Sequence, residues 1–186
     1  MHRNDQGLVS DYLDGDEESL KLLISTHLPS VYNFTYGLCG NKQDAEDIAQ
    51  ETFLKVWKNL RKYKPEQGFK TWLFSIARNT TIDLMRKRKN FVFSDFEFED
   101  GKNRVEYKLA DENPLADELS IQKEDKKVLT EAMEKLSPAQ KTTLIMYYTE
   151  ELTFKEIGEV LEKPLDTVKS QHRRALIRLR QIIGKL

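Results

Sequence analysis

The sequence has little cysteine, few chain-breaking residues and no long apolar run. Its 186 residues include one cysteine, 8 glycines and 5 prolines. A single thiol, Cys39, cannot form an intramolecular disulfide or a multi-cysteine zinc site. The three histidines His2, His27 and His172 are scattered along the chain, so we expect neither a metal centre nor a cofactor. No segment approaches the roughly 18 consecutive apolar residues that a membrane-spanning helix needs.

A net charge is also nearly absent, because 30 Lys and Arg face 31 Asp and Glu. Taken alone, this balance argues against a polyanionic partner. The order of the charges indicates the opposite, since the net charge is −7 over residues 1–54, +9 over 55–90, −5 over 91–130 and +2 over 131–186. Two basic segments separated by an acidic one favour contact with nucleic acid at two places. Ordinary solvated helix faces are the alternative interpretation.

The N-terminal segment is acidic and lacks the basic-then-apolar layout of a secretory signal, which predicts an intracellular protein. Apolar residues recur at helical spacing through most of the chain, and glycine and proline are sparse. We expect an all-α fold of two small helical domains joined by an acidic linker. The expected helices are one or two in Leu8–Ser25, then Val31–Cys39 after Pro29, a helix from Asn41 to Tyr63, and Phe69–Lys89. The stretch FVFSDFEF at 91–98 is interpreted as linker, because no partner strand is evident.

The last fifty residues have the pattern of a helix-turn-helix. Ser137 and Gln140 form a capping box that opens one helix, and Thr153 and Glu156 form another that opens a short helix to Leu161. After a tight turn at 162–164, a longer basic helix is expected over 165–183. Such a helix enters the major groove of duplex DNA in many regulators. A helical hairpin with a solvated basic face is the alternative, and His172 is expected to pack against the core.

The basic segment 55–90 interleaves its cations with aromatic residues. Aromatic side chains stack on unpaired bases while cations follow the phosphates, so this pattern favours single-stranded nucleic acid. We expect Trp72 to be buried, whereas Tyr63 and Phe69, which flank a polar loop, are expected to be exposed. Just upstream of this basic segment, Asp44, Asp47 and Glu51 recur at helical spacing and form one acidic helix face. Such a face is either solvated surface or a site for an electrically patterned protein partner.

Two segments resemble a known family. DAEDIAQETF (44–53) with FKTWLFSIARNTTIDLMRKRK (69–89) is similar to region 2 of bacterial sigma factors, and LSPAQKTTLIMYYTEELTFKEIGEVLEKPLDTVKSQHRRALIRLR (136–180) is similar to region 4. The two-region size resembles the extracytoplasmic-function (ECF) group of the sigma-70 family. The resemblance implies a region 2 helical bundle over 1–90, a linker over 91–127 and a region 4 helix-turn-helix over 128–186.

The resemblance also implies site residues. The expected contacts with the clamp helices of RNA polymerase are Asp44, Asp47, Gln50 and Glu51. The expected contacts with unpaired bases of the −10 element are Arg61, Tyr63, Phe69, Arg78, Asn79, Asp83 and Arg86. The expected contacts with the duplex −35 element are Thr167, Lys169, Ser170, Gln171, Arg173, Arg174 and Arg178.

The chain departs from the family pattern at two positions of the last helix. Family members often have glycine where Asp166 stands and arginine where Gln171 stands. The first change adds a negative charge near the phosphates, and the second removes a donor. In the family the linker threads the basic RNA path of the polymerase, and the acidic and aromatic FSDFEFED at 93–100 suits a positive channel.

The resemblance therefore implies a promoter-specificity subunit without catalytic chemistry. It would bind core RNA polymerase through its clamp helices and flap, direct it to −10 and −35 elements, and promote promoter melting. An anti-sigma factor is the further expected partner, and it could hold this cytoplasmic bacterial protein at the membrane. One rival is a helix-turn-helix regulator acting without polymerase, which leaves residues 44–90 unexplained. The other is a nucleic-acid enzyme, for which the sequence provides no paired acids, metal ligands or phosphate loop.

Overall fold

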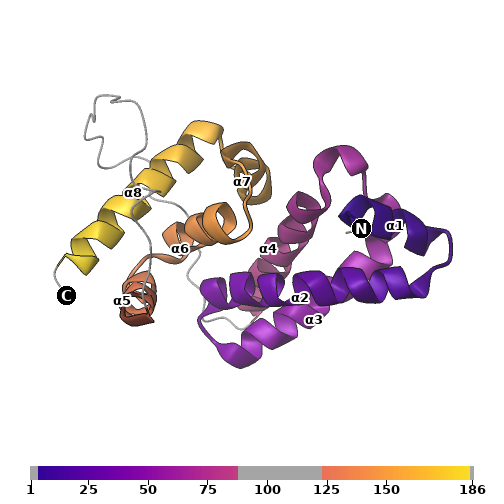
Figure 1. The fold of residues 1–186 in the computed structure, drawn as a ribbon, viewed down its shortest axis with the longest axis horizontal. Helices are drawn as coiled ribbons and strands as arrows, with labels where there is room; N and C mark the ends of the chain where they lie inside the picture. Colours follow the sequence, from indigo (N-terminus) through magenta and orange to yellow (C-terminus); the bar gives the residue numbers. More distant parts are fainter. Residues whose placement is uncertain (1–3, 88–122, 185–186) are drawn as a thin grey trace.

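The computed structural model describes residues 4–87 and 123–184, and every regular element in those ranges is a helix (Figure 1). The chain forms α1 (Asp5–Leu13), α2 (Glu17–Cys39), α3 (Lys42–Asn59) and α4 (Phe69–Lys87), with two short 3₁₀ turns, η1 (Leu60–Lys62) and η2 (Pro65–Gln67), between α3 and α4. It continues with α5 (Lys123–Glu134), α6 (Pro138–Leu144), a π-helical turn η4 (Ile145–Thr149), α7 (Phe154–Leu161) and α8 (Leu165–Ile183). The all-α prediction is confirmed for these ranges. The FVFSDFEF segment and most of the predicted linker lie outside the described residues.

Local capping signals determine where the helices begin. The Asn41 side chain accepts a hydrogen bond from the backbone N–H of Asp44, which opens α3. Both predicted capping boxes are present, with Ser137 and Gln140 at α6 and Thr153 and Glu156 at α7. These reciprocal bonds satisfy backbone donors that have no partner inside the helix.

Helix α2 differs from the expectation because it runs through Pro29 without ending. Proline in a helix interior removes one backbone hydrogen bond, at a cost of about 3 kcal/mol. On either side of Pro29 the helix buries Leu23, Val31 and Phe34, which are at most 1% exposed. Their burial is worth roughly 1.5–3 kcal/mol per side chain, so packing of this face holds the helix intact.

One buried apolar cluster spans both helix bundles, and a second one lies within the C-terminal bundle. The N-terminal bundle consists of α1 to α4 and the C-terminal bundle of α5 to α8, and Figure 1 shows α4 beside α7 and α2 beside α6. Phe34 and Phe74 meet edge to face in the N-terminal bundle, with ring centroids 5.1 Å apart. Met146 and Ile157 of the C-terminal bundle belong to the same buried cluster. The bundles are therefore packed together by apolar contact.

Polar contacts border this shared core. Lys70 of α4 donates a hydrogen bond from Nζ to the backbone carbonyl of Glu150 at 3.1 Å. Arg78 of α4 lies 3.4 Å from the carboxylate of Glu162, in the turn between α7 and α8. Gly37 of α2 faces Ile145, whose Cδ1 is 2.9 Å from the place a Cβ would occupy. A side chain at this position would require the Ile145 side chain to move.

Candidate nucleic-acid and polymerase interfaces

The acidic face of α3 carries the predicted polymerase contacts on its solvent side. Ala45, Ile48 and Ala49 on the opposite side are buried against the bundle. Asp47 and Gln50 are consequently exposed, and Asp44 and Glu51 are half-buried. Sequence reasoning missed that the same face continues into two large apolar side chains, Leu54 and Trp57, which are 48% and 51% exposed. The spacing 47, 50, 54 and 57 was the available signal, because it keeps these residues on one helix face.

A pocket of about 280 Å³ lies between the end of α3 and the middle of α4. Trp72 and Ile76 supply its apolar wall, and Asn79 adds an amide group. The pocket is lined by Lys55, Asn59, Lys62, Trp72, Ile76, Asn79 and Thr80. Two cations, two amides and one indole in one concave site can hold a phosphate beside a stacked base.

Asp83 borders this pocket without lining it. Its Oδ2 is 3.9 Å from Nζ of Lys55, so Asp83 forms a surface ion pair with one cation of the pocket. Of the residues predicted to bind the −10 element, Asn79 alone is among the residues that line the pocket. Sequence reasoning did not place Asn59, Ile76 or Thr80 here, since their convergence depends on how α3 crosses α4.

An aromatic cluster forms beside the pocket, with a different exposure from the one expected. Phe69 is 4% exposed, so the prediction that it is exposed is wrong. Trp72, expected in the core, is only half-buried and reaches the pocket. Tyr63 is half-buried and its ring is 5.4 Å from that of Trp72. Helix periodicity does not explain the exchange, because Phe69 and Trp72 are three residues apart and their ring centroids lie 6.0 Å from each other. The His27 ring of α2 packs on Phe69 at 5.3 Å, so a contact from another helix accompanies the deeper burial of Phe69.

The hydroxyl of Tyr63 remains a hydrogen-bond donor at neutral pH. Partial burial raises the pKa of Tyr63, and the nearby charges of Asp5 and Glu66 raise it further. A protonated phenol can donate to a base or phosphate, whereas a phenolate would repel phosphate.

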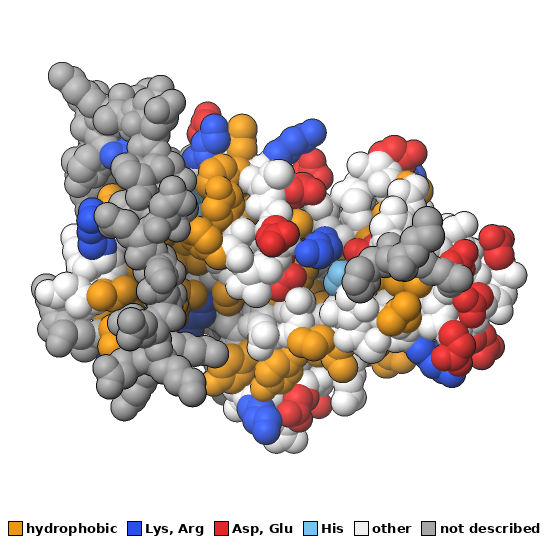
Figure 2. Space-filling model, in the orientation of Figure 1, with side chains coloured by type: hydrophobic (Ala, Val, Ile, Leu, Met, Phe, Trp, Pro, Cys, Tyr) orange, Lys and Arg blue, Asp and Glu red, His pale blue; other side chains and the backbone are white. Residues whose placement is uncertain are grey.

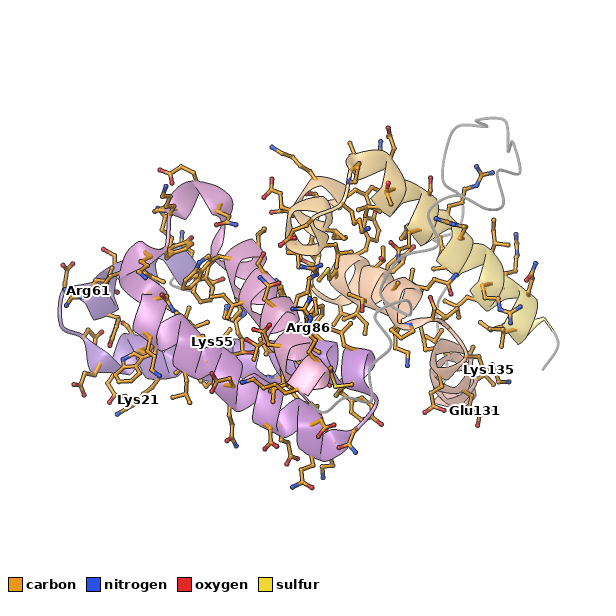
Figure 3. The ribbon with its side chains drawn as sticks, turned by 180° about the vertical axis from the view of Figure 1, so that it is seen from behind. Lys21, Lys55, Arg61, Arg86, Glu131 and Lys135 are labelled. Atoms are coloured by element: carbon orange, nitrogen blue, oxygen red, sulfur yellow. The ribbon has the colours of Figure 1, made fainter. Side chains whose placement is uncertain are left out.

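The predicted arginines are distributed over separate surfaces. In Figure 3 the labelled residues Arg61 and Arg86 lie well apart, with Lys55 between them. Both arginines are exposed. Arg78 instead points toward the C-terminal bundle, where it pairs with Glu162 and also donates to Oδ1 of its neighbour Asn79. In this arrangement Arg78 is therefore engaged by protein rather than presented to a ligand.

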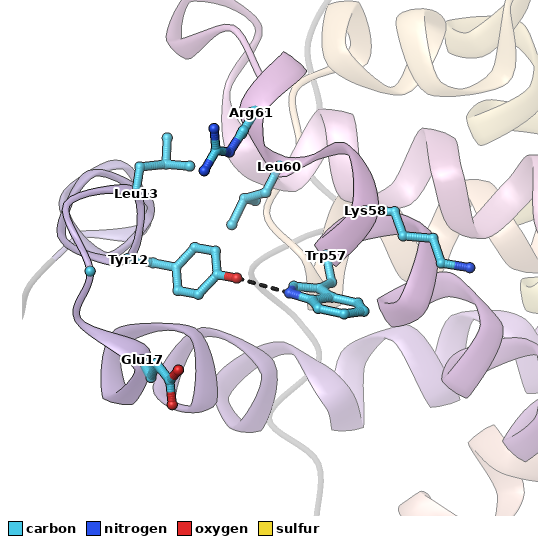
Figure 4. A pocket seen from close by; sticks show the side chains of 8 residues that line it. Tyr12, Leu13, Glu17, Trp57, Lys58, Leu60 and Arg61 are labelled. Atoms are coloured by element: carbon cyan, nitrogen blue, oxygen red, sulfur yellow. Dashed lines mark hydrogen bonds between the residues drawn. The ribbon is translucent and has the colours of Figure 1, made fainter.

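Arg61 borders a second pocket, of about 430 Å³, on the other side of the α3 terminus (Figure 4). Trp57 spans this pocket and donates from Nε1 to the Tyr12 hydroxyl at 2.8 Å, which ties α3 to α1. Glu17 and Lys58 also line it. Its mixed charges distinguish it from the basic pocket beside α4. Figure 2 shows acidic side chains gathered at the α1 end of the molecule.

Helix α8 presents most of its predicted duplex contacts to solvent. Lys169, Ser170, Arg173, Arg174 and Arg178 are exposed and Thr167 is half-buried. Gln171 is different, with 4% of its surface exposed and no hydrogen-bond partner for its buried Oε1. In this arrangement Gln171 is therefore not presented to solvent as the other predicted contacts are. Gln171 shares the core face with Val168 and Ala175, at a spacing of three and four residues that could have revealed it.

His172 packs against the core as predicted. It is 6% exposed, and its ring centroid lies 4.8 Å from that of Tyr147 and 5.0 Å from that of Phe154. This burial lowers the pKa of His172, because the charged imidazolium loses its hydration. In the described ranges, no three His, Cys, Asp or Glu side chains gather as metal ligands, and none of the helices is long and apolar enough to cross a membrane.

Comparison with known proteins connects both surfaces to one family. The family model for sigma-70 region 2 matches residues 23–91, and the model for sigma-70 region 4 matches residues 132–181. Over 173 residues the chain is 30% identical to the ECF RNA polymerase sigma factor SigW of Bacillus subtilis, covering 92% of each chain. The chain belongs to the ECF group of RNA polymerase sigma factors.

Solved structures agree with this ECF sigma fold. The chain superposes on CnrH, solved in complex with the cytosolic domain of CnrY, with a TM-score of 0.66 at 17% identity, covering 97% of each chain. It superposes on the sigma factor RpoE of Bartonella quintana, solved with the anti-sigma factor NepR, with a TM-score of 0.62 at 24% identity, covering 88% of this chain and 96% of that one. At these identities the likeness concerns the fold.

The two regions of this ECF sigma factor can now be placed on the structure. Region 2 begins within α2 and includes the acidic face of α3 and the pocket beside α4. Region 4 begins near the end of α5 and includes the helix-turn-helix of α7 and α8. Helix α1 precedes the segment that the region 2 model matches.

Proposed function

We propose that this protein is a transcription initiation factor that binds core RNA polymerase and directs it to promoters through −10 and −35 elements. Residues 1–90 would bind polymerase and the −10 element, and residues 128–186 would bind the −35 element. The observation that carries the proposal is the pocket between α3 and α4, where Trp72 and Asn79 lie beside Lys55 and Lys62. This chemistry suits an unpaired base with its phosphate better than it suits a duplex.

Polymerase would dock on the exposed face of α3. Asp47 and Gln50 provide polar contacts at one end, and Leu54 and Trp57 provide exposed apolar contacts on the same helix face. A polar and an apolar part on one rigid helix suit a protein partner. The change Gln50→Ala should weaken binding to core polymerase, with Asp14→Ala on the exposed end of α1 as a control. Equal loss in both variants would indicate that the helix bundle had been disturbed instead.

Promoter melting would follow from the aromatic site in region 2. Extruding a base from the duplex costs a few kcal/mol, and each base stacked on an aromatic side chain returns about 1–3 kcal/mol. Trp72 is half-exposed at the pocket and Tyr63 lies against it, so these rings are the candidates for stacking. Arg78 would join only after leaving Glu162.

Region 4 would read the −35 element as duplex through the exposed side chains of α8. The N-terminal residues of such a helix meet base edges, while later arginines meet phosphates. Lys169 and Ser170 occupy the first two turns, and Arg174 and Arg178 lie further along the helix. Gln171 is buried, so the exposed side chains of α8 are the better candidates for this role.

We also propose an anti-sigma protein as a partner, which could hold this protein at the membrane. Both similar folds named above were solved with such a regulator or a cytosolic partner domain. A matching site on this chain would be the apolar surface that includes Leu54 and Trp57, because a regulator that covers it blocks polymerase.

Transcription with purified core RNA polymerase and a library of randomised promoters tests the function. Adding the protein should select templates with two shared sequence elements. Trp72→Ala should reduce transcripts about fivefold to 150-fold, since a lost stacking contact is worth about 1–3 kcal/mol. Asp14→Ala should leave them unchanged. Tight binding to duplex without polymerase, and no transcripts with it, would instead favour a conventional helix-turn-helix regulator.

A further inference from the structure

A hydrogen bond connects the first helix to the middle of α2. The Nε2 atom of His27 lies 2.9 Å from Oδ1 of Asp5, although 22 positions separate these residues in the sequence. His27 is 4% exposed, whereas the side chain of Asp5 is 28% exposed. A buried imidazole whose ring nitrogen is bonded to a carboxylate has its ring orientation determined by that bond.

The ring of His27 supports the aromatic cluster of region 2. Its centroid lies 5.3 Å from that of Phe69. Phe69 in turn contacts Tyr63, at 5.7 Å, and Trp72, at 6.0 Å, and both of these rings are half-buried. The contacts therefore form layers, from Asp5 through His27 and Phe69 to the two rings that reach the surface. Closely packed layers of this kind transmit a shift of an inner ring to the outer ones.

We propose that Asp5 is a positioning residue for the base-stacking rings Tyr63 and Trp72, acting through His27 and Phe69. The proposal rests on the single-strand role proposed above for these rings. The benefit is preorganisation, because rings held in place before binding lose less conformational freedom when a base stacks on them. Helix α1 precedes the segment matched by the region 2 model, so this support comes from outside the matched region.

A purely structural tether is the competing explanation. In that case the Asp5–His27 bond only holds α1 against the bundle, and its loss lowers the free energy of unfolding without altering the stacking surface. The Trp57–Tyr12 bond already ties α1 to α3 independently, so α1 has a second attachment when Asp5 is changed. The two explanations therefore differ in what happens to Trp72.

The fluorescence of Trp72 can report the position of this ring. The protein has two tryptophans, so the signal of Trp72 has to be separated from that of Trp57. Acrylamide quenching is measured in each variant with and without Trp72→Phe, and the difference gives the signal of Trp72 while the Trp57–Tyr12 bond stays in place. We expect Asp5→Ala to change the quenching of Trp72. Asp5→Asn should preserve the wild-type value, because an amide oxygen can still accept from His27. Asp14→Ala, at the residue that follows α1, should preserve it as well. Unchanged quenching in Asp5→Ala would overturn the proposal.

Binding of a fluorescein-labelled single-stranded DNA of random sequence to the full chain then tests the consequence. We expect Asp5→Ala to weaken this binding about threefold to tenfold, the range that one hydrogen bond is worth. Asp5→Asn should restore it, and affinity for core polymerase should be equal in all variants. Normal DNA binding in Asp5→Ala would overturn the proposal. If the wild-type protein failed to bind the DNA, the single-strand role would fail, while Trp72 quenching would still decide whether Asp5 positions the rings.

Discussion

His172 should make the stability of region 4 depend on pH in a predictable direction. The imidazole is surrounded by the rings of Tyr147, Tyr148 and Phe154, and its Nε2 atom is buried without a hydrogen-bond partner. Burial lowers the pKa of His172 in the folded protein, whereas the unfolded chain keeps a value of about 6.5. Between these two pKa values the unfolded chain binds a proton that the folded chain excludes. The free energy of unfolding therefore falls as the pH drops below about 6.5, and it levels off below the folded pKa.

The magnitude follows from proton linkage. One proton bound only by the unfolded chain lowers stability by at most about 1.4 kcal/mol per pH unit. At about pH 5.5 the loss relative to about pH 7.5 can therefore reach about 1.4 kcal/mol from this one residue. Other titrating groups add their own pH dependence, so the informative quantity is a difference between two proteins. His172→Phe provides the comparison, since phenylalanine suits the aromatic surroundings and does not titrate.

Urea unfolding followed by circular dichroism, at both pH values, measures this difference. The wild-type protein should lose more stability than His172→Phe between pH 7.5 and pH 5.5, and the two should differ little in their pH response above pH 7.5. Equal losses in both proteins would refute the reasoning. A larger loss in His172→Phe would mean that the folded state prefers the charged imidazole.

Three further substitutions test particular contacts by urea unfolding. Gln171→Leu should leave the free energy of unfolding unchanged or raise it by about 1 kcal/mol, because it removes a buried oxygen without a partner; a loss above about 2 kcal/mol would mean that Oε1 is bonded. Gly158→Val should cost about 1–3 kcal/mol, since a Cβ there would lie 2.8 Å from the backbone carbonyl of Lys163. An unchanged stability would show that the turn can move away. Thr153→Ala should cost about 1 kcal/mol through loss of its side-chain cap at α7, and Lys155→Ala in the same helix serves as the control.

Local signals predicted the helices well because capping is a local interaction. Asn41, Ser137 and Thr153 each bond a backbone group three residues ahead, so the sequence alone contains both partners. The limits 165 and 183 of the last helix were also predicted correctly, the first of them from the tight turn before it. The break near Pro29 was predicted wrongly, because the buried residues that hold α2 together contact helices far away in the sequence.

The sequence predicted which segments form the candidate site. It did not predict which neighbouring helix each site residue would face. Arg78 and Asn79 are neighbours in α4 and were expected to serve one site. In the structure Arg78 meets Glu162 of the C-terminal bundle, and Asn79 lines the pocket beside α3. Adjacent residues in a helix point about 100° apart, so two helices packed on different sides divide them.

The sequence by itself determined the order of the charges, the helical periodicity, the caps and the two family motifs, all of which depend on residues close together in the chain. Only the tertiary structure decided that Trp72 reaches the surface while Phe69 and Gln171 are buried, and that Asp5 contacts His27 beneath the aromatic cluster. The physical reason is that periodicity establishes which residues share a helix face. Which neighbouring helix covers that face depends on packing between segments that are distant in the sequence.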